Sequence, residues 1–216
     1  MKNELLKRIL SSIVLIPTTL FFIIKGSIFF NFFLLICFLI TIFEWYKISK
    51  KISYSFFGII FLIFSFYSIY SLRNEFSDNY LYLLFVAIIC VATDIGGYIF
   101  GKTFKGPKLI KISPNKTYSG MIGGFFLSII LTTIYINYFN LIQKKIEFTI
   151  EIFFIVLLVS AVSQIGDIVI SYFKRLSNIK NTGKIIPGHG GLLDRIDGMI
   201  FAFPFSYIIL SLNFLI

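Results

Sequence analysis

Long, uninterrupted apolar runs follow one another along this chain. A helix needs roughly 20 apolar residues to cross a hydrocarbon layer about 30 Å thick. The runs are continuously apolar rather than alternating, which favours helices over a barrel. The sequence therefore predicts an all-α polytopic membrane protein with about seven transmembrane helices, at 9–24, 27–46, 53–72, 79–100, 118–139, 148–172 and 198–216.

The composition agrees with a membrane protein. The chain is 57% hydrophobic and 14% charged, whereas soluble domains are about 25% charged. A net charge of +10 would indicate nucleic acid as a partner in a soluble protein. In a membrane protein it indicates cytoplasmic loops and an anionic substrate or lipid, so we expect no nucleic-acid partner. The run at 9–24 follows basic residues but precedes no small-residue cleavage site, so we expect a retained anchor.

The distribution of positive charge predicts the orientation. With the N-terminus inside, 16 of the 20 Lys and Arg residues fall on the inner segments, which is a clear cytoplasmic bias. Two inner loops, 101–117 and 173–197, are rich in both glycine and lysine. We therefore expect a single integral-membrane domain over 1–216, with N-terminal helices in 1–75, catalytic helices and loops in 79–216, and an active site facing the cytoplasm.

An aspartate lies near the inner end of each helix that leads into these loops. A carboxylate in a membrane span costs at least a few kcal/mol unless it is paired or hydrated. For Asp94, an interfacial pair with Lys102 and a polar site opening to the cytoplasm both remain open. Asp167 has polar neighbours on one helix face, which predicts a hydrated cleft; they are Ser163, Gln164 and Ser171.

The most polar stretch of the chain is PGHGGLLDRIDG, at 187–198. Asp194 and Asp197 are three residues apart, so they lie on one face if this segment opens the last helix. Two carboxylates in this arrangement suit a hard cation such as Mg²⁺, which takes oxygen ligands. Simple capping of a helix N-terminus is the alternative interpretation.

The glycines of this stretch predict a turn that can approach a ligand closely. Gly188, Gly190 and Gly191 can adopt unusual backbone angles, and successive N–H groups in such a turn can cradle a phosphate. His189 could donate to a phosphate, act as a base or stabilise the turn. The basic residues around it strengthen the phosphate interpretation; they are Lys174, Arg175, Lys180, Lys184 and Arg195.

Several common catalytic motifs are absent from the sequence. It has no GxxxxGK[ST] loop, GxGxxG turn, GxSxG elbow or Cys/His zinc spacing. The site must therefore be built from the membrane helices and the two basic loops. The residues alone predict metal-dependent chemistry on a phosphorylated lipid.

The run SYFKRLSNIKNTGKIIPGHGGLLDRIDG resembles the signature of phosphatidate cytidylyltransferases, also called CDP-diacylglycerol synthases. The matching residues are Ser171, Lys174, Arg175, Lys180, Gly183, Pro187 to Gly191, Asp194, Arg195 and Asp197. The run TDIGGYIFGKTFKGPKLIKISPNKTYSG is similar to the same family through Asp94, Gly97, Tyr98, Gly101, Ser113, Pro114, Lys116 and Thr117. The chain departs from the family at Ser119 and Ile170, where the family has Glu, and at Asn181, where it has Asp.

The resemblance implies transfer of a cytidylyl group from CTP to phosphatidic acid, giving CDP-diacylglycerol and pyrophosphate. We expect the protein in a bacterial inner membrane, with an organelle membrane as the alternative. It implies Mg²⁺ with room for a second cation, contact with membrane lipid, and leaves a homodimer open. It implies that Asp167 and Asp194 hold the metal, with Asp197 ligating or orienting. The implied catalytic cations are Lys174 and Arg175. The implied substrate-binding residues are Asp94, Ser113, Lys116, Thr117, Ser171, Lys180, His189, Gly190, Gly191 and Arg195.

Four other functions fit part of the pattern. A lipid-alcohol kinase of related architecture would transfer the γ-phosphate and release a nucleoside diphosphate. A cytidylyltransferase acting on another lipid phosphate is a close variant. An anion transporter would need polar residues along several helices, whereas here polarity gathers at the cytoplasmic ends. A degenerate homologue kept for assembly or regulation would explain the three missing carboxylates.

Overall fold

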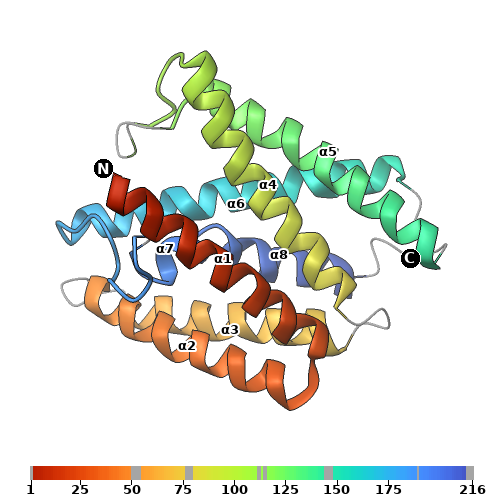
Figure 1. Ribbon diagram of the computed structural model, residues 1–216, viewed down its shortest axis with the longest axis horizontal. Coiled ribbons are helices and arrows are strands. Elements are labelled where there is room, and N and C mark those ends of the chain that lie inside the picture. Colours follow the sequence, from red (N-terminus) through yellow and green to blue (C-terminus); the bar gives the residue numbers. More distant parts are fainter. Residues whose placement is uncertain are drawn as a thin grey trace. The chain divides into compact units, whose positions relative to one another are not determined.

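A computed structural model describes residues 2–49, 55–75, 80–110, 113, 116–143, 148–188 and 190–212 (Figure 1). Two residues of the expected site, Pro114 and His189, lie outside this part of the chain. Within it the elements are helices, and the only strand-like pairings are two isolated bridges. The expected all-α class is confirmed. The helices are α1 (Lys2–Lys25), α2 (Ser27–Ser49), α3 (Ser55–Asn74), α4 (Leu81–Phe104), α5 (Tyr118–Gln143), α6 (Ile150–Leu176), α7 (Leu193–Ile196) and α8 (Met199–Ser211).

Five helices are long and apolar enough to cross a membrane, which makes the chain an integral membrane protein. They are α2, α3, α4, α5 over Tyr118–Tyr138, and α6. The first and last expected spans correspond to shorter apolar helices, Leu10–Lys25 and Met199–Ser211. The expected count of seven spans therefore stays a prediction.

Several helix ends differ from those that the sequence predicts. α4 continues to Phe104 and α6 to Leu176, beyond the expected ends at 100 and 172. Hydrophobicity falls in these last turns, but backbone hydrogen bonds continue through polar residues, so apolar length underestimates helix length. α7 is a separate short helix inside the expected loop at 173–197, and α8 begins only at Met199.

The chain divides into two compact units, and each is described by itself. The first holds residues 1–80 and 173–197, and the second holds 81–172 and 198–216. The long helix α6 crosses the boundary at residues 172–173. The basic loop at 173–197 thus belongs to the same unit as α1, α2 and α3. The expectation of one membrane domain over 1–216 stays a prediction.

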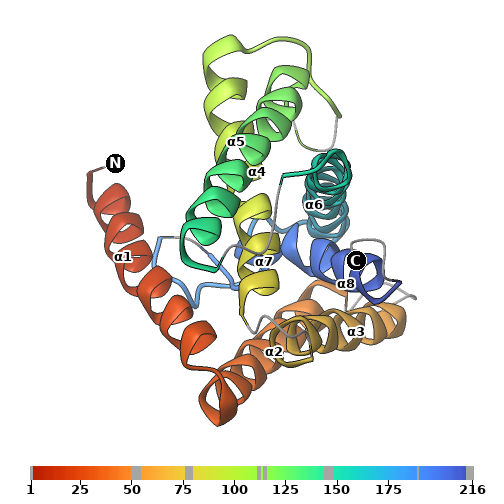
Figure 2. The same ribbon diagram turned by 90° about the vertical axis from the view of Figure 1, so that its right-hand side faces the viewer.

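In the first unit, α1 and α2 form a hairpin that turns at Gly26, whose φ is +64°. Arg73 at the end of α3 donates from Nε to the carbonyl oxygen of Ile23 at 2.7 Å, and it is only 8% exposed. It thereby satisfies one of the last carbonyls of α1, which have no partner inside the helix. Figure 2 shows α2 and α3 lying side by side in this unit.

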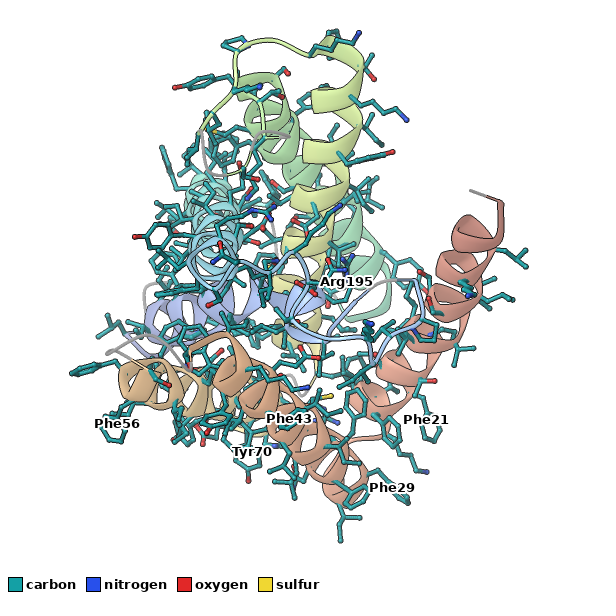
Figure 3. All side chains as sticks on the ribbon, turned by 90° about the vertical axis from the view of Figure 1, so that its left-hand side faces the viewer. Phe21, Phe29, Phe43, Phe56, Tyr70 and Arg195 are labelled. Atoms are coloured by element: carbon teal, nitrogen blue, oxygen red, sulfur yellow. The ribbon has the colours of Figure 1, made fainter. Side chains whose placement is uncertain are left out.

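The outer faces of the first unit are apolar and aromatic. Large exposed side chains point away from the helices, as lipid-facing residues do. Those labelled in Figure 3 are Phe21, Phe29, Phe43, Phe56 and Tyr70.

In the second unit, α4 and α5 lie side by side (Figure 1) and pack glycine against glycine. A Cβ atom at Gly96 would clash with the carbonyl oxygen of Gly123, and one at Gly120 would lie 2.7 Å from that of Gly97. Small residues let two membrane helices approach this closely without a side chain between them. Van der Waals contact between the two backbones therefore holds this pair.

The helix α6 joins α4 and α8 through small polar residues. The hydroxyls of Thr93 on α4 and Ser160 on α6 are 2.7 Å apart. A Cβ atom at Gly198, just before α8, would overlap the side chain of Ser163 on α6. These close contacts fix the part of α6 that precedes Asp167.

Candidate active site

The structure brings several of the expected site residues together, with two that were not expected, in two groups, one in each unit. We call the group in the first unit the loop cluster; it consists of Glu44, Lys174, Thr182, Asp194 and Asp197. We call the group in the second unit the Lys116 cluster; it consists of Lys116, Gln164, Asp167 and Ser171.

The backbone that carries the loop cluster is a tight glycine turn. Ile186 and Gly190 exchange two hydrogen bonds, with N···O distances of 2.9 and 3.1 Å. Gly188 and Gly190 have φ values of +76° and +94°, which glycine adopts without the Cβ penalty of other residues. The turn leads directly into α7, so its geometry fixes the position of Asp194 in the first turn of that helix.

Asp194 is buried and fully engaged by donors of the same unit. Its Oδ1 accepts a hydrogen bond from Nζ of Lys174 at 2.9 Å. Its Oδ2 accepts from the backbone N–H of Thr182 at 2.8 Å, the hydroxyl of Thr182 at 3.1 Å and the N–H of Gly191 at 3.0 Å. Burial alone would raise the pKa of Asp194, but these hydrogen bonds, with that of Lys174 foremost, hold the pKa below its ordinary value. Asp194 is therefore a carboxylate at neutral pH.

Asp197 faces the same ammonium group. Its Oδ2 lies 3.8 Å from Nζ of Lys174, so the two aspartates do lie on one side, as their spacing predicts. They do not open the last helix, which is a correction to the sequence analysis. Asp194 belongs to α7 and Asp197 is the residue that ends it, because the chain makes one helical turn before α8 starts.

Sequence analysis missed Glu44, the acidic member of the loop cluster that comes from α2. Its carboxylate accepts hydrogen bonds from the backbone N–H of Leu192 at 3.0 Å, the N–H of Leu193 at 2.8 Å and the hydroxyl of Thr182 at 2.8 Å. It is only 1% exposed. The signal that could have found it is a single carboxylate in an otherwise apolar span, which is costly unless it is paired.

The backbone N–H groups of residues 190–193 have acceptors within the first unit. That of Gly190 donates to Ile186, that of Gly191 to Asp194, and the next two to Glu44. In this structure the turn therefore binds carboxylate and carbonyl oxygens. The expected contact of Gly190 and Gly191 with a phosphate stays a prediction, as does the role of His189.

The other expected cations of the first unit lie at its surface. Arg175, Lys180 and Arg195 are exposed, and Arg195 extends from α7 (Figure 3). Nη1 of Arg175 donates to the carbonyl oxygen of Ile179 at 3.5 Å. These side chains are accessible to an anionic substrate, in contrast to the buried Lys174.

The Lys116 cluster joins the first basic loop to α6. Nζ of Lys116 lies 2.5 Å from Oδ2 of Asp167 and donates to the carbonyl oxygen of Gln164 at 3.4 Å. The hydroxyl of Ser171 donates to Oδ1 of Asp167 at 3.3 Å. The shared polar face that the spacing predicts on α6 is therefore confirmed for Asp167 and Ser171, and its cationic partner is Lys116.

The rest of the first loop is folded back on itself. Lys108 and Thr117 form a bridge, and the N–H of Leu109 donates to the carbonyl oxygen of Lys116 at 2.8 Å. The N–H of Lys116 donates in turn to Ser113 at 3.0 Å. The expected nucleotide-covering residues Ser113, Lys116 and Thr117 are thus brought together in one compact loop.

Asp94 lies exposed on α4. Lys102, two turns further along the helix, contacts Tyr98: its Nζ lies 3.4 Å from the hydroxyl and 5.5 Å from the ring centroid. A substrate-binding role for Asp94 stays a prediction.

The three positions that depart from the family are filled without a carboxylate. The hydroxyl of Ser119 donates to the carbonyl oxygen of Lys105 and closes the first loop. Ile170 is buried in α6. Asn181 is exposed, with its Cβ beside Gly190. Ser119 and Ile170 therefore have a hydrogen-bonding and a packing role of their own, whereas the structure gives no reason for asparagine at 181.

The oxygen donors of Asp194 and Asp197 suit a hard cation chemically. Among the described residues, however, no three His, Cys, Asp or Glu side chains gather as a metal centre would. The ammonium of Lys174 lies beside both aspartates. The expected metal ligands Asp167, Asp194 and Asp197 therefore stay a prediction.

Comparison with known proteins gives a consistent result. The model of the cytidylyltransferase family matches residues 49–213. A phosphatidate cytidylyltransferase of Rickettsia bellii is 35% identical over 96% of this chain and 91% of that protein. One of Rickettsia felis is 34% identical over 96% and 93%. One of Bacillus subtilis is 39% identical over 61% of this chain and 48% of that longer protein. The chain therefore belongs to the cytidylyltransferase family.

Proposed function

We propose that this chain transfers a cytidylyl group from CTP to phosphatidate, giving CDP-diacylglycerol and pyrophosphate. We place the reaction at the cytoplasmic face of a bacterial inner membrane. The observation that carries the proposal is the buried Lys174, held by Asp194 and Asp197 within the segment that matches the family. The names of the relatives supply the two substrates.

The reaction makes one bond and breaks one. An oxygen of the lipid phosphate forms a bond to the α-phosphorus of CTP, and the bond from that phosphorus to the oxygen bridging it to the β-phosphate breaks. Pyrophosphate leaves with the bonding electrons. Negative charge grows on the transferring and leaving oxygens, so fixed cations and positioning should supply most of the rate enhancement.

Of the two proposed catalytic cations, Lys174 is the one held firmly in place, whereas Arg175 is accessible at the surface. Two carboxylates hold the ammonium of Lys174 in place, and the hydrogen bonds to Asp194 keep that carboxylate from turning away. The exposed Arg175 and Arg195 are proposed to bind phosphate groups, with Lys180 in support. A fixed cation costs no reorganisation when charge develops, which is the condition for strong electrostatic catalysis.

Magnesium, when bound, would neutralise charge on the phosphate oxygens as a Lewis acid. The residues proposed to hold it are Asp167, Asp194 and Asp197. In the second unit, Lys116 holds Asp167 by an ion pair, and the loop of Ser113 and Thr117 is proposed to cover the nucleotide. The acyl chains are proposed to enter sideways between apolar helices.

The position of an isotope decides between this reaction and lipid phosphorylation. Detergent micelles containing phosphatidate are incubated with the protein, Mg²⁺ and CTP labelled at either the α- or the γ-phosphate. Cytidylyl transfer puts the α-label into the lipid and leaves the γ-label in pyrophosphate. A lipid that takes up the γ-label instead would overturn the proposal.

A further inference from the structure

We propose that Glu44 is a positioning residue of the reaction: from α2 it holds the glycine turn and α7, and thereby sets the geometry of Lys174 and Asp194. The catalytic part of this inference rests on the proposed function. Glu44 lies just before the segment that matches the family model, which begins at residue 49.

Glu44 caps α7 from a distant part of the chain. The first N–H groups of a helix have no partner inside it, and the residue before α7, Leu192, makes no capping bond with its own side chain. The two carboxylate oxygens of Glu44 accept the N–H groups of Leu192 and Leu193 at 3.0 and 2.8 Å. An acceptor more than 140 residues away in the sequence therefore caps α7 in place of a local side chain.

Two glycines of the loop make room for this carboxylate, which is a separate observation. A Cβ atom at Gly183 would lie 2.6 Å from Oε1 of Glu44, and one at Gly191 would overlap both the hydroxyl of Thr182 and Oε2 of Glu44. Neither glycine has a positive φ in the structure. Their small size is thus explained by the space that Glu44 and its partner Thr182 occupy rather than by backbone angles.

Thr182 connects Glu44 to the expected catalytic residues. Its hydroxyl lies 2.8 Å from Oε2 of Glu44 and 3.1 Å from Oδ2 of Asp194. Asp194 in turn binds Lys174 at 2.9 Å. If Glu44 is removed, three donors lose an acceptor in a buried place, and the loop must shift to find others. Such a shift moves Asp194 relative to Lys174.

Other contacts anchor α2 to the end of α6 without Glu44. The rings of Trp45 and Phe173 pack edge to face with centroids 5.2 Å apart, and the hydroxyl of Ser177 donates to the carbonyl oxygen of Ile48. Variants of Glu44 should therefore keep the helices in place and loosen the loop alone.

The first test separates kcat from KM. Glu44→Ala should lower kcat about 100-fold, because a misplacement of about 1 Å in a catalytic group can cost that much. The KM for CTP should stay within about 3-fold, as for an interaction that acts in the transition state. Glu44→Gln, which keeps one acceptor oxygen, should recover part of kcat. The matched control is Thr41→Val, one turn earlier on α2, where a buried hydroxyl donates only to Cys37 of its own helix; its kcat should equal wild type.

The second test reads the loop without using activity. Lys180 and Lys184 are exposed trypsin sites in the loop. In micelles, Glu44→Ala should be cut there at least about 10-fold faster than wild type, as expected for local opening. Its thermal midpoint should fall only slightly, because the freed donors reach water once the loop opens, and Thr41→Val should be cut at the wild-type rate.

The kcat and trypsin measurements together decide whether the inference stands. Faster cleavage with reduced kcat supports the inference. Unchanged cleavage, or faster cleavage with wild-type kcat, overturns it. A wild-type protein that makes no CDP-diacylglycerol overturns the proposed function instead, while the trypsin result still decides whether Glu44 holds the loop.

Discussion

The ammonium of Lys174, near the end of α6, lies 2.9 Å from the carboxylate of Asp194 on α7, 20 residues further along the chain. The two side chains are only 11% and 4% exposed. This ion pair joins the end of a long helix to the loop that carries most of the family signature.

Removing one partner of this pair should destabilise the protein strongly. Lys174→Met leaves the Asp194 carboxylate buried without its cation, which typically costs about 3–5 kcal/mol. The double variant Lys174→Met with Asp194→Asn removes both charges and should be more stable than Lys174→Met alone. Thermal unfolding in detergent measures both, with Arg175→Met as the control because that neighbouring side chain is exposed.

A midpoint of Lys174→Met equal to that of Arg175→Met would contradict this account of the pair. A double variant that is less stable than Lys174→Met would contradict it as well. Replacing the unpaired Asp194 carboxylate would then lower stability, whereas the account of the pair requires it to raise stability.

The Lys116 cluster should matter for turnover more than for stability. Lys116 and Asp167 are 23% and 29% exposed, and such partly exposed pairs contribute about 1 kcal/mol or less. Lys116→Met should therefore unfold near the wild-type temperature. Turnover should nevertheless fall by about 10- to 100-fold, because Asp167, a proposed metal ligand, loses the cation that positions it. A variant that loses stability and activity in proportion would assign Lys116 a structural role only.

The glycine contact between α4 and α5 predicts different outcomes at two neighbouring positions. Gly96→Ala places a Cβ against the carbonyl oxygen of Gly123 and should cost about 1–3 kcal/mol, as overpacking usually does. Gly97→Ala meets its nearest atom, the carbonyl oxygen of Gly120, at 3.7 Å. It should be neutral or slightly stabilising, because alanine favours a helix over glycine. Equal thermal midpoints for the two variants would show that the helices are not in this close contact.

The hairpin between α1 and α2 depends on the buried Arg73. Arg73→Met leaves the carbonyl oxygen of Ile23 without its donor and should destabilise the protein by about 1–3 kcal/mol. Lys25→Met, at the exposed end of α1, should change the free energy of unfolding by less than about 0.5 kcal/mol. Both substitutions remove one positive charge, but only Arg73→Met removes the buried hydrogen bond. Thermal midpoints measured in the same detergent therefore test whether Arg73 acts through this hydrogen bond or through its charge alone.

Most of the helices could be predicted because an apolar run of sufficient length has few alternatives in a membrane. Their ends could not, because polar residues such as Lys102 and Lys174 continue a helix beyond its apolar part. The short helix α7 was missed for a similar reason. One helical turn carries no periodicity, and its formation depends on the acceptor that Glu44 supplies.

Neighbouring polar residues could be predicted from the sequence where their spacing places them on one face of a helix, as for Asp167 and Ser171 on α6. Glu44 could not be linked to the loop from sequence, because a bond between residues 44 and 192 leaves no local pattern. Conformational freedom predicts phosphate binding by Gly188, Gly190 and Gly191, and this stays a prediction. The contact of Gly183 and Gly191 with the carboxylate of Glu44 is visible only in the folded chain.

The proposed reaction is tested most simply by turnover in micelles of phosphatidate with labelled CTP and Mg²⁺, for wild type and Asp194→Asn. Wild type should give CDP-diacylglycerol and pyrophosphate in equal amounts. Asp194→Asn should lose turnover, although that variant still inserts into the membrane. Full activity of Asp194→Asn would overturn the role of Asp194, and no product from a well-folded wild type would overturn the proposed reaction.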